Sequence, residues 1–330
     1  MQKQHGSTSN LGLYVYAAAT IFLGLLGLIF GDFATPWQHV GTNVHFRVPL
    51  AYLTAVVELA GGLALFYHRT ARIGALTLTG LYSVFTLLWV PQALVNLGNY
   101  DPIGNVFEEF SLVAAALVLS ATYSPSGSSI ERRRPFFVLL FGICTISFGI
   151  VHIMDMPGLL GAIPGWLPPT RMFWAYITTL GFFAAAVAIL TGIMARLASR
   201  LLIVEIVIFE LLFWIPNLFA EPRNHFNWAG NAISIAIAGS AWVVSDSLSM
   251  YGSAIDKDAL AKLSEQCSAA GALEHTAGGV VKASDERDKR VNGPDRGRRT
   301  LLQNLRRHRR RIFHSEGFSE NGFTGNIRLD

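Results

Sequence analysis

The chain is poor in charge, poor in cysteine and without the short motifs of common soluble enzymes. Of its 330 residues only 15% are Asp, Glu, Lys or Arg, whereas 52% are apolar, and the mean hydropathy is +0.40. A composition this apolar excludes an intrinsically disordered chain, a collagen-like chain and a single soluble globule. A membrane protein is the class that remains.

The missing motifs exclude several kinds of chemistry. Cys144 and Cys267 are the two cysteines and form no C-x-x-C pair, which argues against thiol–disulfide exchange within the chain. No G-x-G-x-x-G sequence follows a strand pattern, so the flavin and nicotinamide fingerprints are absent. No histidines have the short local spacing of a metal site, and only His152 lies inside an apolar segment, whereas a bis-histidine haem needs two. The sequence therefore predicts no metal site.

The charge that is present is concentrated near the C-terminus. Residues 1–247 carry 11 basic and 11 acidic side chains, whereas residues 248–330 carry 15 and 11, so the net charge of +4 belongs to the last segment. Eight arginines between Arg296 and Arg311 alternate with apolar residues, which is typical of a basic amphipathic segment on anionic lipid. A solvated, disordered tail is the alternative interpretation. Nucleic acid is not an expected partner, because a membrane tethers the chain.

Long apolar segments predict the fold class. A bilayer core of about 30 Å requires about 20 apolar residues per helix. Eight segments meet this requirement: 13–31, 49–67, 73–93, 106–122, 136–154, 173–194, 201–219 and 228–246. The first is too long for the apolar region of a signal peptide and is expected to remain as an anchor. Arginines gather in the short loops on the side of the termini, so we expect an all-α protein of the inner (cell) membrane with both termini cytoplasmic.

The two halves of the chain share a sequence pattern. Four matches keep their order and nearly constant spacing: Ala51-Tyr52-Leu53-Thr54 with Ala175-Tyr176-Ile177-Thr178, Arg72 with Arg196, Leu88-Trp89-Val90-Pro91 with Phe213-Trp214-Ile215-Pro216, and Asn105 and Glu109 with Asn227 and Asn231. The pattern predicts two parallel four-helix repeats, 1–125 and 126–247, followed by a basic cytoplasmic tail, 248–330.

Three motifs in the first half carry a family resemblance. They are Val57-Glu58-Leu59-Ala60-Gly61-Gly62-Leu63, Arg69-Thr70-Ala71-Arg72-Ile73-Gly74-Ala75-Leu76, and Glu108-Glu109-Phe110. With these motifs, residues 11–122 resemble the DoxX family of small four-helix membrane proteins, and the second half resembles a diverged copy. The resemblance implies an association with membrane redox systems, such as a thiosulfate:quinone oxidoreductase subunit or complexes with superoxide dismutase. In the second half, Phe182 and Asn231 stand at the positions of Glu58 and Glu109. If these carboxylates are the functional groups, only the first half is therefore functional.

Two glutamates of the first half are candidates for proton handling. Glu58 lies near the middle of its segment, where a carboxyl group costs a few kcal/mol and must face protein or water. A ligand- or proton-binding role and a hydrogen bond to a neighbouring helix are both open for Glu58. Functional and structural roles are equally open for Glu109, one turn inside the predicted start of its helix. Glu108 is expected to cap that helix start in solvent.

The seventh segment contains a second set of candidates. Glu210, Phe213, Trp214 and Asn217 have the i, i+3, i+4, i+7 spacing of one helix face. Glu210, Trp214 and Asn217 are therefore expected either to line the outward mouth of a cavity that binds a cofactor or to form an interior hydrogen-bond ladder. Glu205, close to Arg200, is expected to extend toward the cytoplasmic surface.

Three functions are compatible with these features. The first is a membrane redox subunit that binds a lipophilic carrier such as a quinone, with Glu58 and Glu109 as the catalytic proton carriers and a soluble or membrane-bound redox partner. The second is a transporter or exporter of a small molecule. The third is a non-catalytic membrane scaffold that docks soluble partners through its basic tail.

Overall fold

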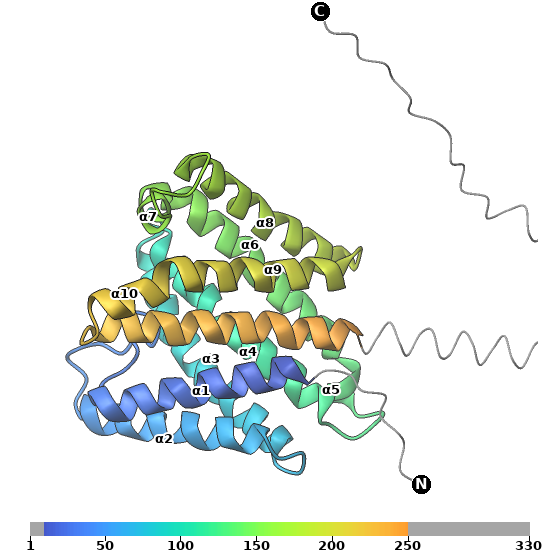
Figure 1. Ribbon diagram of the computed structural model, residues 1–330. Coiled ribbons are helices and arrows are strands. Elements are labelled where there is room, and N and C mark those ends of the chain that lie inside the picture. Colours follow the sequence, from blue (N-terminus) through green and yellow to red (C-terminus); the bar gives the residue numbers. More distant parts are fainter. Residues whose placement is uncertain (1–9, 250–330) are drawn as a thin grey trace, which may run out of the picture. The chain divides into compact units, whose positions relative to one another are not determined.

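The computed structural model describes residues 10–249, and these residues form a bundle of long helices without a β-strand (Figure 1). The helices are α1 (Leu11–Phe30), α2 (Arg47–Leu65), α3 (Ala71–Val95), α4 (Asp101–Thr122), α5 (Ser129–Arg132), α6 (Arg134–Met154), α7 (Met156–Ala162), α8 (Arg171–Thr191), α9 (Ala195–Phe209), η1 (Glu210–Trp214), α10 (Ile215–Ala220) and a last helix, His225–Ser249. The predicted amphipathic segment between Arg296 and Arg311 lies outside the described residues.

Eight of these helices are long and apolar enough to cross a membrane, which confirms the predicted fold class. They begin and end close to the predicted segments, and α9, η1 and α10 together make one of them, Ala195–Ala220. The fourth begins earlier than predicted, at Asp101, because a hydropathy window leaves out the polar first turn. The chain is thus a multi-pass membrane protein by the length and composition of its helices.

Local sequence explains where the helices begin and end. Asp101 and Pro102 open α4, where an acidic side chain and a proline suit the exposed amides of a first turn. The Thr170 hydroxyl caps α8 by accepting a hydrogen bond from the Phe173 amide at 3.1 Å. Gly31 and Gly192 end α1 and α8 in the left-handed conformation that glycine adopts without strain.

Two short helices were not predicted, because hydropathy windows detect only long apolar segments. The Ser128 hydroxyl caps α5 through the Glu131 amide, and the Asp155 carboxylate caps α7 through the Gly158 amide. In Figure 1, α5 lies in the loop between α4 and α6, and α7 lies in the loop between α6 and α8, at the opposite end of the bundle.

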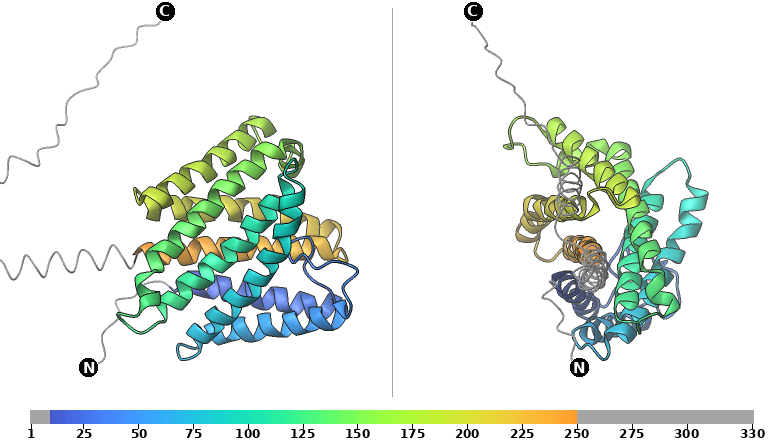
Figure 2. Two further views of the ribbon diagram at one scale, coloured as in Figure 1. Left: turned by 180° about the vertical axis from the view of Figure 1, so that it is seen from behind. Right: turned by 90° about the vertical axis from the view of Figure 1, so that its right-hand side faces the viewer.

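The last helix joins the two halves of the bundle. A Cβ built on Gly239 would lie 2.7 Å from the backbone nitrogen of Tyr16, and one on Gly12 would lie 2.5 Å from the carbonyl carbon of Trp242. The backbones of α1 and the last helix therefore touch, as small residues allow in membrane proteins. The right-hand view of Figure 2 shows α1 in dark blue beside the last helix in orange.

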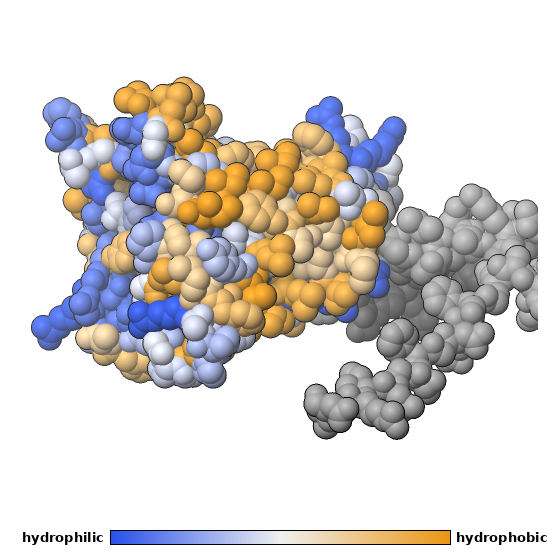
Figure 3. Space-filling view, turned by 90° about the horizontal axis from the view of Figure 1, so that it is seen from above, coloured by the Kyte–Doolittle hydropathy of each residue, from blue (hydrophilic) through white to orange (hydrophobic). Residues whose placement is uncertain are grey.

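Large apolar side chains cover the outer faces of the bundle. Leu53, Ile73, Leu180 and Leu201 are all more than half exposed. In Figure 3 apolar residues dominate the middle of the surface, and hydrophilic residues gather toward its left and right edges. This distribution suits a lipid environment, since lipid chains take the place of water beside such side chains.

Buried positions recur at a constant spacing between the halves. In α2 the buried residues are Ala51, Ala55, Glu58, Gly61, Gly62 and Leu65, and in α8 they are Ala175, Thr179, Phe182, Ala185, Ala186 and Ile189, each 124 positions later. In α1 and α6 the spacing is 125. There the buried Thr20 donates to the carbonyl of Tyr16 at 2.9 Å, and the buried Thr145 donates to that of Phe141 at 3.0 Å.

A π-helical segment changes this spacing within the seventh span. Arg196 follows Arg72 by 124 positions, whereas Trp214 follows Trp89 by 125. Between them lies η1, Glu210–Trp214, a π-turn that accommodates one additional residue within an otherwise α-helical span. Leu202, before the π-turn, is buried like Leu78, and Trp214, its last residue, is buried like Trp89.

Candidate functional site

The first half contains a buried cluster of polar side chains. Glu58 of α2 is 2% exposed, and its Oε1 accepts a hydrogen bond from Nε2 of Gln38 at 2.6 Å. The hydroxyl group of Tyr82 in α3 also interacts with this carboxyl group. Gln38 is itself buried and is held in place because its Oε1 accepts from the Ala34 amide at 3.1 Å. Glu58 thus lies inside the bundle with specific partners.

Glu109 of α4 belongs to the same cluster but has no such partner. It is 1% exposed, and neither carboxyl oxygen has a hydrogen-bond partner among the described residues. It lies close enough to Glu58 for the two carboxyl groups to interact electrostatically. The hydroxyl group of Tyr16, also near both glutamates, donates instead to the carbonyl of Leu112 at 2.9 Å. An unpartnered buried carboxyl group costs stability, which makes Glu109 a candidate for function.

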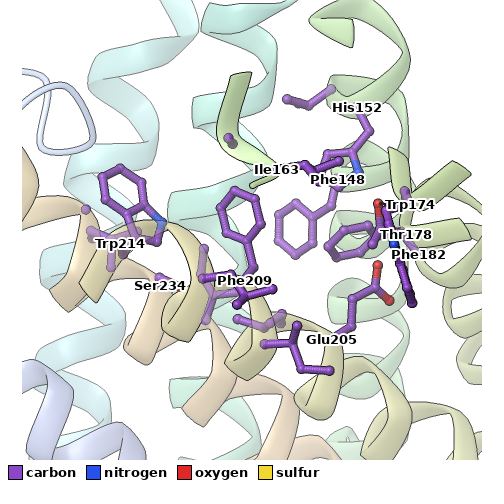
Figure 4. Close-up of a pocket in the computed structure, with 18 of the residues that line it drawn as sticks. Phe148, His152, Ile163, Trp174, Thr178, Phe182, Glu205, Phe209, Trp214 and Ser234 are labelled. Atoms are coloured by element: carbon purple, nitrogen blue, oxygen red, sulfur yellow. Dashed lines mark hydrogen bonds between the residues drawn. The ribbon is translucent and has the colours of Figure 1, made fainter. Parts of the chain in front are cut away.

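A cavity of about 230 Å³ lies in the second half, between α6, α8, α9 and the last helix (Figure 4). Most of its lining is apolar or aromatic. The rings of Phe148, Phe182 and Phe209 lie along its middle, with Trp214 toward one end and Trp174 toward the other. Phe182 packs edge-on against Phe148, with ring centroids 5.8 Å apart. Such walls favour a flat, apolar ligand.

A few polar groups face this cavity. Oε1 of Glu205 and Nδ1 of His152 are buried and have no hydrogen-bond partner among the described residues. Ser234 and Thr178 also line the cavity, although the Thr178 hydroxyl bonds to the carbonyl of Trp174 at 3.0 Å. Glu205 and His152 therefore offer a carboxyl group and an imidazole to a ligand.

Two residues of the first half reach this cavity. Glu108 of α4 lines it, and Oε2 of Glu108 accepts a hydrogen bond from Nε1 of Trp37 at 2.6 Å. The carbonyl of Trp37 in turn accepts from Nε1 of Trp89 at 2.7 Å. The prediction that Glu108 caps a helix start in solvent was wrong. Since α4 begins at Asp101, Glu108 lies about two turns inside the helix and faces the protein interior.

The three residues predicted to line a cavity together are separated in the structure. Trp214 lines the cavity, whereas Glu210 is buried beside Ser234 and Asn217 lies in α10. The carbonyl of Asn217 accepts from Nδ2 of Asn227 at 3.2 Å. The π-turn at Glu210–Trp214 is the physical reason, because an additional residue rotates the next part of the helix and breaks the predicted face.

The prediction that Glu205 extends toward the cytoplasmic surface was also wrong. Its carboxyl group packs against Gly181 of α8, where an added Cβ would lie 2.5 Å from Oε2 of Glu205. The absence of a side chain at Gly181 makes room for this carboxyl group inside the bundle. A glycine in the middle of the neighbouring span was the available sequence signal, but it identifies no partner before the helices are placed.

Neither a metal cluster nor a match to known proteins identifies the site. Within residues 10–249, no group of three or more His, Cys, Asp or Glu side chains could hold a metal ion. Comparisons of the chain with protein-family models, curated proteins and solved structures find no match.

Proposed function

We propose that this multi-pass membrane protein binds a lipophilic, single-ring carrier of the quinone class in the cavity of its second half, as a subunit of a membrane redox system. The observation that carries the proposal is an aromatic cavity inside the membrane-spanning bundle with Glu205 and His152 facing it. A quinone supplies reversible two-electron, two-proton chemistry when bound. The chain's own residues bind and orient the ring, exclude water and hold protons.

The cavity has a suitable size. A cavity of about 150 Å³ lined by Leu, Ile and Phe takes a benzene molecule. The cavity here measures about 230 Å³, which leaves room for a six-membered ring with several small substituents. The edges of Phe148, Phe182 and Phe209 favour the offset or edge-on contacts that aromatic rings adopt.

The polar groups suit the two carbonyl oxygens of a quinone. Those oxygens accept hydrogen bonds, so the protein must supply donors. A ring N–H of His152 and the acid form of Glu205 are available donors in the cavity, whereas the Ser234 hydroxyl also interacts with Glu210. Because the rest of the lining is apolar, these few groups would fix the orientation of the ring.

In this proposal, the two halves are copies of one DoxX-type unit that has been duplicated. The recurrence of buried positions at 124 residues between α2 and α8 supports a duplication, as do the paired Thr20 and Thr145 hydrogen bonds. The contacts between the halves also support it, because the first span of each half packs on the fourth span of the other: α1 on the last helix and α6 on α4. A DoxX-type unit is associated with membrane redox systems, which agrees with a quinone ligand.

Transport of an organic cation is a second candidate function. Glu108 and Glu205 both line the cavity, together with Trp37, Trp174 and Trp214. Carboxylates beside aromatic faces attract a cation through charge and through cation–π contacts. The π-turn η1 beside the cavity also interrupts the regular hydrogen bonding of its span, as in helices that line transport sites.

Mass spectrometry of co-purifying lipophilic molecules tests the proposal. Wild-type protein in mild detergent is expected to retain a quinone, and the Glu205→Gln variant is expected to lose most of it. Glu221→Gln, in an exposed loop, is the matched control and should retain the ligand. Equal quinone retention in all three proteins would remove Glu205 from the site, and an organic amine in place of quinone would favour transport, to be checked by flux into vesicles.

A further inference from the structure

Consecutive glutamates of α4 face two different sites. Glu109 is buried in the first half, close to Glu58 and Tyr16, whereas Glu108 lines the cavity of the second half. Adjacent positions on a helix point about 100° apart, so one short segment of backbone can present a carboxyl group to each side. The helix α4 packs both on α3 and on α6, and therefore lies between the two sites.

Glu58, Glu109 and Glu108 form a series of carboxyl groups that leads to the cavity. Two consecutive residues of the α1–α2 connection hydrogen-bond to two of them. Nε1 of Trp37 donates to Glu108, and Nε2 of Gln38 donates to Glu58, each at 2.6 Å. An ion pair of 2.7 Å between Arg47 and Asp32 ties the two ends of the same connection together. In the spatial order Glu58, Glu109, Glu108, cavity, these hydrogen bonds therefore hold Glu58 and Glu108 in place.

The charge balance of this series requires bound protons. In the described part of the chain, the basic side chain nearest to the connection, Arg47, pairs with Asp32 and not with any of the three glutamates. Neighbouring carboxylates without a counter-ion repel each other strongly in an apolar interior, so the series retains at least one proton. The other titratable groups that face it are Tyr16 of α1 and Tyr82 of α3, with His152 and Glu205 across the cavity.

We infer that Glu109 and Glu108 pass protons between the buried cluster at Glu58 and the cavity of the second half. A proton taken up at Glu58 moves to Glu109 and then to Glu108, each time through one bridging water, because Glu109 has no direct hydrogen-bond partner among the described residues. Each glutamate becomes an acid as its neighbour becomes a carboxylate. Only O–H bonds form and break, and no electron moves. The use of the proton by a bound quinone rests on the proposed function, whereas the route itself needs no ligand.

Hydrogen–deuterium exchange followed by infrared spectroscopy of the ligand-free protein tests the route. The carbonyl stretching band of the protonated Glu58–Glu109 pair is assigned from its loss in Glu58→Gln and Glu109→Gln. Its exchange in heavy water is expected to slow by at least about tenfold in Glu108→Gln, since a positioned acid–base group contributes about 10²–10⁴-fold to proton transfer. Glu210→Gln, a buried carboxyl group outside the series, should exchange like wild type. Equal rates in Glu108→Gln and wild type would overturn the inference.

A second pair of variants guards against misfolding. Glu108→Asp keeps a proton carrier and should exchange faster than Glu108→Gln, and Trp37→Phe keeps Glu108 while removing its donor. If Glu108→Gln unfolds in thermal melts, the other two variants test the route. The route is supported if Trp37→Phe, which keeps Glu108, exchanges at the wild-type rate while Glu108→Asp exchanges more slowly than the wild type. Full loss of exchange in Glu108→Asp, with intact folding, would overturn it, because a carboxyl group is still present.

Duroquinone binding separates this inference from the proposed function. If duroquinone fails to bind the wild-type protein but Glu108→Gln still slows exchange, the proposed ligand is wrong and the route stands. If duroquinone binds and the exchange rate is unchanged in Glu108→Gln, the ligand site stands and the route is wrong.

Discussion

The spans α2 in the first half and α8 in the second bury positions that lie 124 residues apart but fill some of them with different chemistry. Glu58 in the first half corresponds to Phe182 in the second, and Glu109 corresponds to Asn231. Phe182 lines the cavity, and Nδ2 of Asn231 donates to the carbonyl of Trp214 at 3.1 Å. Each half thus keeps a buried carboxyl oxygen without a partner among the described residues, on Glu109 in the first and on Glu205 in the second, and the described cavity lies in the second half.

This comparison explains why two sites can coexist in one small bundle. Both halves use the same small buried residues to bring helices together, so few exchanges at buried positions change the chemistry without changing the fold. A cavity and an unpartnered carboxyl group both cost stability. Both halves therefore carry such a cost, at Glu109 in the first and at Glu205 beside the cavity in the second.

The largest effect is expected from breaking the contact that joins the halves. Gly239→Leu would force a side chain into the backbone of α1 at Tyr16, and we expect a loss of about 3 kcal/mol of unfolding free energy. The measurement is chemical or thermal unfolding in mild detergent. Gly80→Leu is the matched control, because no atom lies within 4 Å of a Cβ built there, and it should change stability by less than about 0.5 kcal/mol.

An intermediate effect, of opposite sign at two positions, would sharpen the comparison. Glu58→Leu leaves Nε2 of the buried Gln38 without its acceptor and is expected to cost about 1–3 kcal/mol. Glu109→Leu removes a carboxyl group that has no partner among the described residues and is expected to stabilise the fold by about 1 kcal/mol. The same unfolding assay measures both. A larger loss for Glu109→Leu than for Glu58→Leu would mean that Glu109 is a structural group.

The smallest effect tests whether the halves are equivalent where their chemistry is the same. Thr20→Val and Thr145→Val each remove a hydroxyl group that bonds to its own helix four residues earlier. Each should cost at most about 1 kcal/mol, and the two values should agree within about 0.5 kcal/mol, which allows for the long 3.5 Å hydrogen bond that Thr20 also accepts from the Tyr82 hydroxyl. A clear difference between the two variants would show that the matched threonines contribute unequally to the free energy of unfolding.

Sequence alone predicted the eight spans well, because the length of an apolar segment is a local property. It missed α5, α7 and the polar first turn of α4, where hydropathy and helix formation do not coincide. The cavity could not be predicted, since it depends on how side chains from four helices fill the space between them. Glu205 illustrates this limit, because its inward position depends on Gly181 in another span.

The π-turn at Glu210–Trp214 has a consequence for how the two halves of the chain are aligned with each other. It absorbs a change of chain length inside a membrane span, without a loop, and both Leu202 before it and Trp214 at its end remain buried. An alignment of the two halves that permits gaps only in loops would pair Trp214 and Pro216 with residues one position away from Trp89 and Pro91. Membrane spans of unequal length can therefore share one geometry, and the π-turn marks the place where the count changes.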